Sequence, residues 1–136
     1  MTLAGSCHCG RVTIALDRAP VEVTGCNCTS CYKHGVLWAY FAPGEVRVVG
    51  ETASYVRADV KIPATDLRFC AHCGCTTHWA ATEAYVRHAG VDDRMGVNMR
   101  LFDEELLTRI PVRVLEGRSW DVDEEWAPVS QAGEQP

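Results

Sequence analysis

Hydrophobic and polar residues alternate in short stretches along most of the chain, and this pattern predicts a protein built of short β-strands. In residues 11–17, for example, Val12, Ile14 and Leu16 alternate with polar or small residues, as in a half-buried strand. Further strands are predicted at residues 21–26, 36–41, 46–49, 54–57, 67–70, 76–79, 96–102 and 112–115. Turn-forming Gly, Pro and Asp residues separate them. The pattern indicates a mainly antiparallel β fold.

One stretch alone favours a helix in this interpretation. Asp103 can cap residues 104–109, which carry two acids in the first turn and an arginine at the end, before Pro111. We therefore expect little helix.

The charge of the chain is concentrated at its C-terminal end. The formal net charge is −5, and residues 121–136 contain five acids and no Lys or Arg, so the other 13 acids equal the 13 basic residues. We expect a single domain over residues 1–120 and an acidic, flexible tail over residues 121–136. A body without basic excess argues against nucleic-acid binding, and no apolar run has the roughly 18 residues of a membrane-spanning helix.

The N-terminus has neither the basic nor the apolar region of a secretory signal peptide, so we expect a cytoplasmic protein. Disulfides are rare in that reducing compartment. The eight cysteines of the 136-residue chain are therefore expected to serve metal binding or catalysis rather than to form disulfide bonds.

The eight cysteines fall into three clusters with close spacing. These are Cys7 and Cys9; Cys26, Cys28 and Cys31; and Cys70, Cys73 and Cys75. The sequence His-Cys-Gly occurs at residues 8–10 and again at 72–74, which indicates two similar turns. Structural zinc takes four such ligands from two arms, so Cys7, Cys9, Cys70 and Cys73 are predicted to form one site.

The middle cluster supplies three ligands, which is typical of a catalytic zinc with an exchangeable fourth position. Water, a substrate thiolate or Cys75 can complete it, and with Cys75 the site becomes closed and structural. Thiolates also suit iron. The two Cys-x-x-Cys pairs lack the βαβ surroundings of a redox dithiol. His34 and His78 are candidates for proton transfer.

Three segments resemble signature segments of the glutathione-dependent formaldehyde-activating enzymes, a family that also includes centromere protein V. They are residues 5–10 (Gly-Ser-Cys-His-Cys-Gly), 26–31 (Cys-Asn-Cys-Thr-Ser-Cys) and 69–74 (Phe-Cys-Ala-His-Cys-Gly). Residues 96–100 are similar to a late strand of the family. The resemblance spans about residues 3–118, with order and spacing retained. Cys75 departs from it, because many members are expected to have a small or polar residue there.

The resemblance implies a zinc-containing β-tent fold of antiparallel sheets, with two zinc ions per chain. It implies a structural zinc on the first four cysteines, and a second zinc on Cys26, Cys28 and Cys31 that glutathione sulfur can reach. The implied function is a carbon–sulfur lyase, which joins glutathione and formaldehyde reversibly to S-hydroxymethylglutathione. Arg57, Arg100 and Lys33 are candidates for binding glutathione carboxylates.

A different class of function is compatible with the same residues. A zinc-stabilised module can carry glutathione or bind a protein partner without catalysis. One branch of the family suggests chromatin or nucleic-acid binding. The absence of net charge in residues 1–120 argues against this function here. Exposed strand edges make a homodimer plausible.

Overall fold

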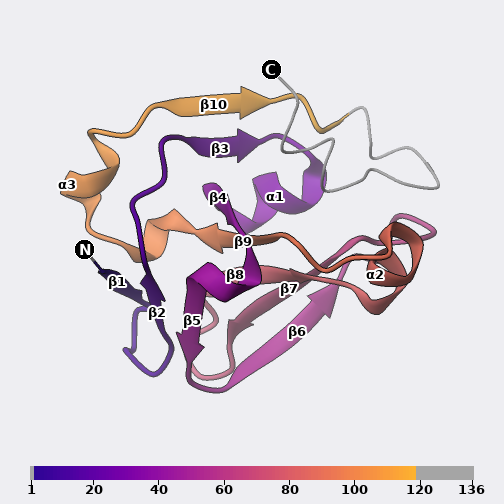
Figure 1. The fold of residues 1–136 in the computed structure, drawn as a ribbon, viewed down its shortest axis with the longest axis horizontal. Coiled ribbons are helices and arrows are strands. Elements are labelled where there is room, and N and C mark those ends of the chain that lie inside the picture. Colours follow the sequence, from indigo (N-terminus) through magenta and orange to yellow (C-terminus); the bar gives the residue numbers. More distant parts are fainter. Residues whose placement is uncertain (1, 119–136) are drawn as a thin grey trace.

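The computed structural model describes residues 2–118 as two β-sheets with little helix (Figure 1). The small sheet has the order β1-β2-β5 and the large one the order β10-β3-β4-β9-β8-β7-β6. The small sheet consists of β1 (Leu3–Ser6), β2 (Thr13–Leu16) and β5 (Val46–Val49). The large sheet consists of β3 (Val23–Cys26), β4 (Trp38–Phe41), β6 (Thr52–Val56), β7 (Thr65–Cys70), β8 (Thr76–Ala81), β9 (Met95–Asn98) and β10 (Val112–Leu115). The helices are α1 (Thr29–His34), α2 (Glu83–Ala89) and α3 (Glu104–Leu107), with 3-10 turns at Pro43–Glu45 and Met99–Leu101.

The prediction of a mainly antiparallel β fold is confirmed, with one exception in strand direction. β10 pairs with β3 in parallel, and Leu115 lies opposite Cys26 in their register. The two strands lie side by side and point the same way in Figure 1. Because the pairing is parallel, the C-terminal ends of both strands meet at the same end of the sheet.

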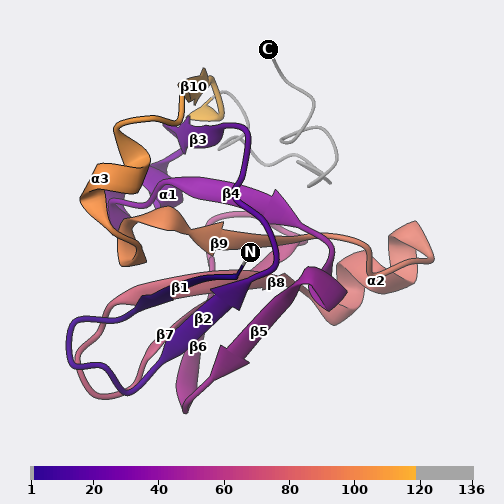
Figure 2. The same ribbon diagram turned by 60° about the vertical axis from the view of Figure 1, so that its left-hand side comes forward.

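Hydrophobic side chains form a core on each face of the large sheet. Ile14 and Leu16 of the small sheet pack with Val97 and Phe41 in the first core, which joins the two sheets. Figure 2 shows the small sheet in front of the large one. Trp38, next to the buried Ala39 of the first core, belongs to a second core with Leu67, Trp79 and Tyr85. Because successive residues of a strand point to opposite faces, β4 contributes to both cores.

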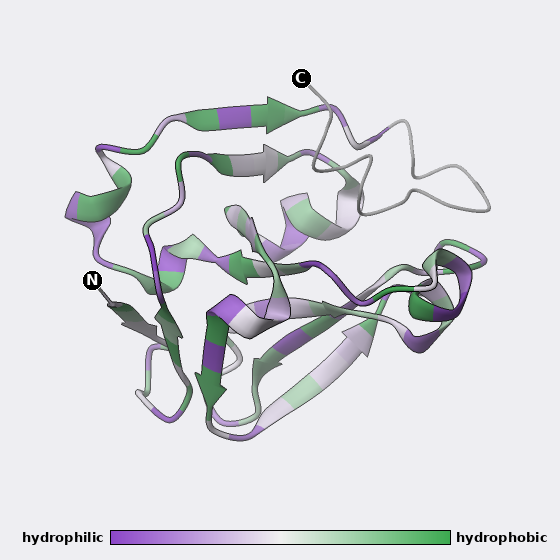
Figure 3. Ribbon diagram, viewed as in Figure 1, coloured by the Kyte–Doolittle hydropathy of each residue, from purple (hydrophilic) through white to green (hydrophobic). Residues whose placement is uncertain are grey.

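The edges of the large sheet are exposed. β6 forms one edge and has few hydrophobic residues, as its pale colour in Figure 3 shows. β10 forms the other edge, where Val112 and Val114 are exposed. The homodimer expected from exposed edges stays a prediction.

The prediction of a single helix was wrong, because the structure also contains α1 and α2. α1 buries no residue completely, so it has no apolar stripe by which a sequence pattern is recognised. α2 does carry start and stop signals. Thr82 caps its first turn by accepting a hydrogen bond from the N–H of Tyr85, and Gly90 ends it in the left-handed conformation.

The strand predicted at residues 96–102 is shorter than expected. β9 ends at Asn98, whose side-chain oxygen accepts a hydrogen bond from the N–H of Arg100 at 3.2 Å. This bond satisfies the backbone outside the sheet and turns the chain into the 3-10 conformation.

One expectation concerns a region that the structure does not describe. The acidic tail predicted at residues 121–136 lies outside the described residues, so the division into domain and tail stays a prediction. Within residues 2–118, no helix has the length and hydrophobicity needed to cross a membrane.

Candidate metal centres

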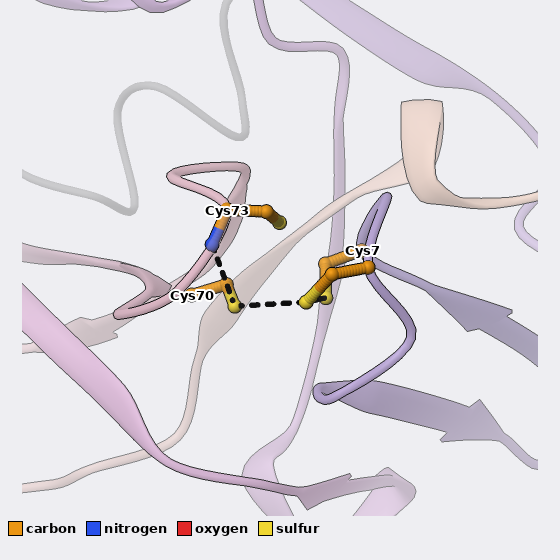
Figure 4. A group of neighbouring side chains, drawn as sticks. Cys7, Cys70 and Cys73 are labelled. Atoms are coloured by element: carbon orange, nitrogen blue, oxygen red, sulfur yellow. Dashed lines mark hydrogen bonds between the residues drawn. The ribbon is translucent and has the colours of Figure 1, made fainter.

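Four cysteine sulfurs from two distant loops meet where the small sheet approaches the turn between β7 and β8. Cys7 and Cys9 lie in the loop after β1, and Cys70 and Cys73 lie at the end of β7 and in the loop after it. Figure 4 shows Cys7 facing Cys70 and Cys73 across the site. Their sulfur atoms all lie within 4.8 Å of one another. The sulfur of Cys9 is 3.7 Å from that of Cys7 and 3.6 Å from that of Cys70. We refer to these four residues as the first cluster.

The two loops of the first cluster have the same backbone design. The N–H of Gly10 donates to the carbonyl of Cys7 at 3.1 Å, and that of Gly74 donates to the carbonyl of Cys70 at 2.9 Å. Both glycines are in the left-handed region, with φ of 83° and 84°, where other residues are strained. The repeated His-Cys-Gly sequence therefore corresponds to two matching turns.

The chemistry of the first cluster fits a closed zinc site. Four soft sulfur donors from two arms are the usual ligand set of structural zinc. Backbone N–H groups, above all those of Cys75 and Cys9, donate to the sulfur of Cys73 and lower its pKa to about 5. Hydrogen bonding of this kind favours the thiolate, which is the form that binds metal.

The second cluster consists of Cys26, Cys28 and Cys31, whose sulfur atoms also lie within 4.8 Å of one another. Cys26 ends β3, and Cys28 is the N-cap of α1, where its sulfur accepts a hydrogen bond from the N–H of Cys31. Residues three apart at the start of a helix lie on the same side. The strand-to-helix turn thus brings the three thiols together without a contribution from distant cysteines.

Each sulfur of the second cluster accepts a hydrogen bond from an N–H group. The backbone N–H of Cys28 donates to Cys26 at 3.5 Å, and that of Cys31 donates to Cys28 at 3.3 Å. The indole N–H of Trp38 donates to the sulfur of Cys31 at 3.2 Å. The tryptophan, which the sequence suggested as a core residue, is buried and also contacts the site.

The three thiols of the second cluster ionise unequally. Hydrogen bonds from Cys26, and then from Cys31, lower the pKa of Cys28 to about 2, and the charge of Arg57 acts in the same direction. The pKa of Cys31 is raised well above its usual value by its hydrogen bonds with Cys26 and Cys28 and by burial. At neutral pH the cluster is therefore partly ionised before any metal binds.

Two further side chains belong to the surroundings of the second cluster. Arg57 was one of three cations considered for carboxylate binding, and it is 14% exposed, pairs with Asp59 at 2.6 Å and donates to Thr29 at 3.4 Å. The other two, Lys33 and Arg100, are exposed. Tyr40, which the sequence suggested as a core residue, also lies close enough to the second cluster to respond to its charges. Burial, followed by the charges of Cys31 and Cys26, raises the pKa of its hydroxyl.

Cys75 lies beside the first cluster and not the second. Its side chain packs against Cys7, Val12 and Cys70, and its sulfur accepts a hydrogen bond from the N–H of His8. It belongs to neither group of mutually close sulfurs. The geometry of the described residues therefore gives no support to a second site closed by Cys75.

The side chain of His78 does not point toward the second cluster. His78 is buried on the face of β8 opposite to Trp79, and the second core that Cys31 contacts includes Trp79. Burial, and then the charge of Arg68, lower the pKa of His78 to about 4. His34, at the end of α1, lies with its ring against Tyr55 and its Nδ1 at 2.7 Å from the carbonyl of Ser30.

Comparison with known proteins identifies a family and a solved structure of similar fold. The model of a family described as glutathione-dependent formaldehyde-activating enzyme matches residues 2–107. A crystal structure of a Rhodobacter sphaeroides protein is similar in fold, with a TM-score of 0.60 and 24% sequence identity. The match covers 82% of this chain and 100% of the other. No curated protein matches this chain.

Proposed function

The chain belongs to the family of glutathione-dependent formaldehyde-activating enzymes, and we propose that it is a zinc-dependent carbon–sulfur lyase. The proposed substrates are glutathione and a small aldehyde such as formaldehyde, which combine reversibly to S-hydroxymethylglutathione. Cys7, Cys9, Cys70 and Cys73 would hold a structural zinc, and Cys26, Cys28 and Cys31 a second one.

The observation that supports this proposal is the unequal number of sulfur donors in the two clusters. The first cluster has four and the second has three, and Cys75 lies at the first. Zinc with three protein ligands keeps a position for an exchangeable ligand, whereas zinc with four is closed. A thiol substrate would therefore bind at the second cluster.

The chain's own residues prepare the second cluster for an anionic thiol. Zinc held there would act as a Lewis acid and lower the pKa of a substrate thiol. The N–H groups of Trp38, Cys28 and Cys31 fix the three sulfurs and offset part of their charge. Arg57, which is paired with Asp59, acts on Cys28 in the direction that favours its thiolate.

The reaction requires one new bond and one proton. The sulfur of the glutathione thiolate forms a bond to the carbonyl carbon of formaldehyde, and the carbonyl π electrons move to oxygen. The resulting alkoxide takes up a proton from water, which balances the proton that the thiol released. The reverse reaction cleaves the same C–S bond.

The exchange of ¹³C-formaldehyde between its hydrate and its glutathione adduct, followed by NMR, tests this proposal. We expect the zinc-loaded protein to increase the exchange rate above the uncatalysed rate. The Cys26→Ser variant should lose the increase and one zinc, while Cys75→Ser should keep both. Unchanged exchange with two zinc ions bound would exclude the lyase, and glutathione binding without turnover would instead favour a carrier.

A further inference from the structure

The chain segment that follows β10 lies directly against the second cluster. Residues 115–118 continue from the parallel pair of β10 and β3, in which Leu115 lies opposite Cys26. A Cβ atom at Gly117 would lie 2.6 Å from the sulfur of Cys26 and 3.3 Å from Cβ of Cys28. The first distance is shorter than real Cβ contacts, so this position has no room for a side chain.

Asn27 makes hydrogen bonds to four successive residues of this segment. Its backbone N–H donates to the carbonyl of Leu115 at 3.1 Å. Its side-chain oxygen accepts hydrogen bonds from the N–H groups of Gly117 at 2.8 Å and Arg118 at 2.9 Å. Its side-chain NH₂ group donates to the carboxylate of Glu116. Asn27 lies between the candidate ligands Cys26 and Cys28, so it ties the end of the described chain to the cluster.

Arg118 adds two contacts to the same attachment. Its Nε donates to the backbone carbonyl of Asn27 at 3.1 Å. Its guanidinium group lies over the ring of Tyr32 in α1, 5.5 Å from the ring centre. The segment is therefore fixed both to the turn that carries Cys26 and Cys28 and to the helix that carries Cys31. It also lies beyond residue 107, where the family match ends.

We propose that residues 115–118, positioned by Asn27, form a fixed wall of the second cysteine site. The wall keeps the sulfur of Cys26 directed at those of Cys28 and Cys31, and it closes one side of the site to solvent and to reagents. Asn27 is a positioning residue in this proposal, and Gly117 is the residue that allows the close approach. The role in zinc binding rests on the function proposed above, whereas the shielding of Cys26 does not.

Two substitutions disturb the wall in different ways. Gly117→Ala places a methyl group against Cys26, so that either the segment moves away or the sulfur rotates out of the cluster. Asn27→Ala leaves Gly117 unchanged and removes the three side-chain hydrogen bonds. Asn27→Asp keeps an oxygen that can accept from Gly117 and Arg118, and it should restore part of the effect. Gly44→Ala is the matched control, because nothing lies within 4 Å of its Cβ position.

The first measurement uses the zinc-loaded protein and a chromophoric chelator. Groups around metal ligands typically change metal affinity about 10- to 100-fold when they are removed. We expect Asn27→Ala and Gly117→Ala to weaken the second zinc about tenfold or more and to accelerate its release, with the first zinc unchanged. Equal affinity and equal release rates in the parent and both variants would overturn the proposal.

The second measurement needs no zinc at the second cluster. After removal of that zinc alone, with the first cluster still loaded, iodoacetamide labelling followed by mass spectrometry gives the alkylation rate of Cys26. We expect this rate to rise several-fold in Asn27→Ala, to rise less in Asn27→Asp and to stay at the parental value in Gly44→Ala. An unchanged rate in Asn27→Ala refutes the wall. Because labelling does not depend on turnover, a protein without lyase activity still gives a decisive result.

Discussion

At the scale of single residues, the second cluster depends on N–H donors that come from different structures. Two are backbone groups of the turn that carries the cysteines, and they form whenever this turn forms. The third is the indole of Trp38, which comes from β4 and requires the folded sheet. The Trp38 side chain therefore links the packing of the core to the hydrogen bonding of the Cys31 sulfur.

Replacing Trp38 by phenylalanine separates these two roles, because most of the ring volume remains and the N–H is lost. Hydrogen bonds to charged groups contribute about 1.5–3 kcal/mol. We expect Trp38→Phe to retain two zinc ions and to lower the free energy of unfolding by about that amount, measured by urea denaturation of the zinc-loaded protein. Trp79→Phe, in the same core, tests the loss of indole volume without a hydrogen bond to a cysteine sulfur. Equal losses in both variants would contradict a specific role for the Trp38 N–H.

The cysteines of the two clusters should differ from Cys75 in metal content. Each candidate ligand belongs to a group of close sulfurs, and removing one leaves an incomplete donor set. We expect Cys28→Ser to bind one zinc ion and Cys75→Ser to bind two, measured by elemental analysis after dialysis. A loss of zinc in Cys75→Ser would assign this thiol a ligand role that its position does not suggest.

Because of His78, we expect the free energy of unfolding to decrease when the pH is lowered below neutral. Its pKa is about 4 in the folded state and about 6.5 when unfolded, so the unfolded chain binds more protons between these values. Stability is then lost as the pH falls from about 6.5 to 4, by at most about 3 kcal/mol. The groups that act on it electrostatically are Arg68 and Asp66. We expect His78→Asn to show a shallower decline in urea denaturation over this range, and an identical slope would contradict this.

The candidate ligands could be predicted from the sequence because each pair or triplet is local. Spacing alone separated four cysteines from three, and the structure groups the sulfurs in the same way. The contacts of Asn27 with Gly117 and Arg118 span 90 and 91 residues. No local pattern indicates such a contact, because it depends on the parallel pairing of β10 with β3.

At the scale of elements, Trp79 on the neighbouring strand β8 leaves no room for a side chain at one position of β9. A Cβ atom at Gly96 would lie 2.0 Å from Nε1 of Trp79, its partner in the register of β8 and β9. Glycine at this position therefore lets the indole lie flat across the strand. The second core, which includes Trp79, is built on this close approach.

A methyl group at Gly96 should destabilise the protein more than one at an open glycine. Overpacking a core typically costs about 1–3 kcal/mol, and displacing a buried tryptophan lies at the upper end. We expect Gly96→Ala to lower the free energy of unfolding by about 3 kcal/mol in urea denaturation, with a changed tryptophan fluorescence. Gly44→Ala, which meets no atom within 4 Å, should leave both unchanged. Similar stabilities of the two variants would contradict this prediction, because they would show that the strands can move apart to accommodate a methyl group at Gly96.

Strands were easier to predict than helices in this chain for a physical reason. β2 and β5 have an apolar face that repeats every second residue, so their pattern is visible without knowledge of the fold. α1 has no completely buried residue, and its position is set by Cys28 at its start and Gly35 at its end. Thr82 and Gly90 mark the ends of α2, but Tyr85 is the one buried residue of this helix, so its apolar face is short.

At the scale of the whole molecule, the clusters differ in how much chain they connect. The first joins Cys9 to Cys70 across 61 residues, whereas the second lies within residues 26–31. The entropy lost by the unfolded chain grows with the length of the closed loop, which gives a difference of about 2 kcal/mol. A metal on the first cluster should therefore stabilise the fold more than one on the second.

This difference predicts unequal effects of ligand loss on stability. We expect Cys7→Ser to lower the free energy of unfolding by about 2 kcal/mol more than Cys26→Ser, because the long-range link is lost. Thermal and urea denaturation of the zinc-loaded proteins measure this difference. Addition of a strong chelator should bring both variants to similar stability, because neither then retains a metal link. A larger loss in Cys26→Ser would contradict the assignment of the structural role to the first cluster.

The local character of the second cluster has a consequence for the order of events during synthesis. Its last cysteine, Cys31, leaves the ribosome 39 residues before Cys70, which the first cluster requires. At about 5–20 residues per second, this interval lasts about 2–8 seconds. During this time a nascent chain contains all three thiols of the second cluster but only two of the four of the first, Cys7 and Cys9. The cluster that is proposed to react is therefore the first that can take up zinc, and the wall from residues 115–118 closes over it last.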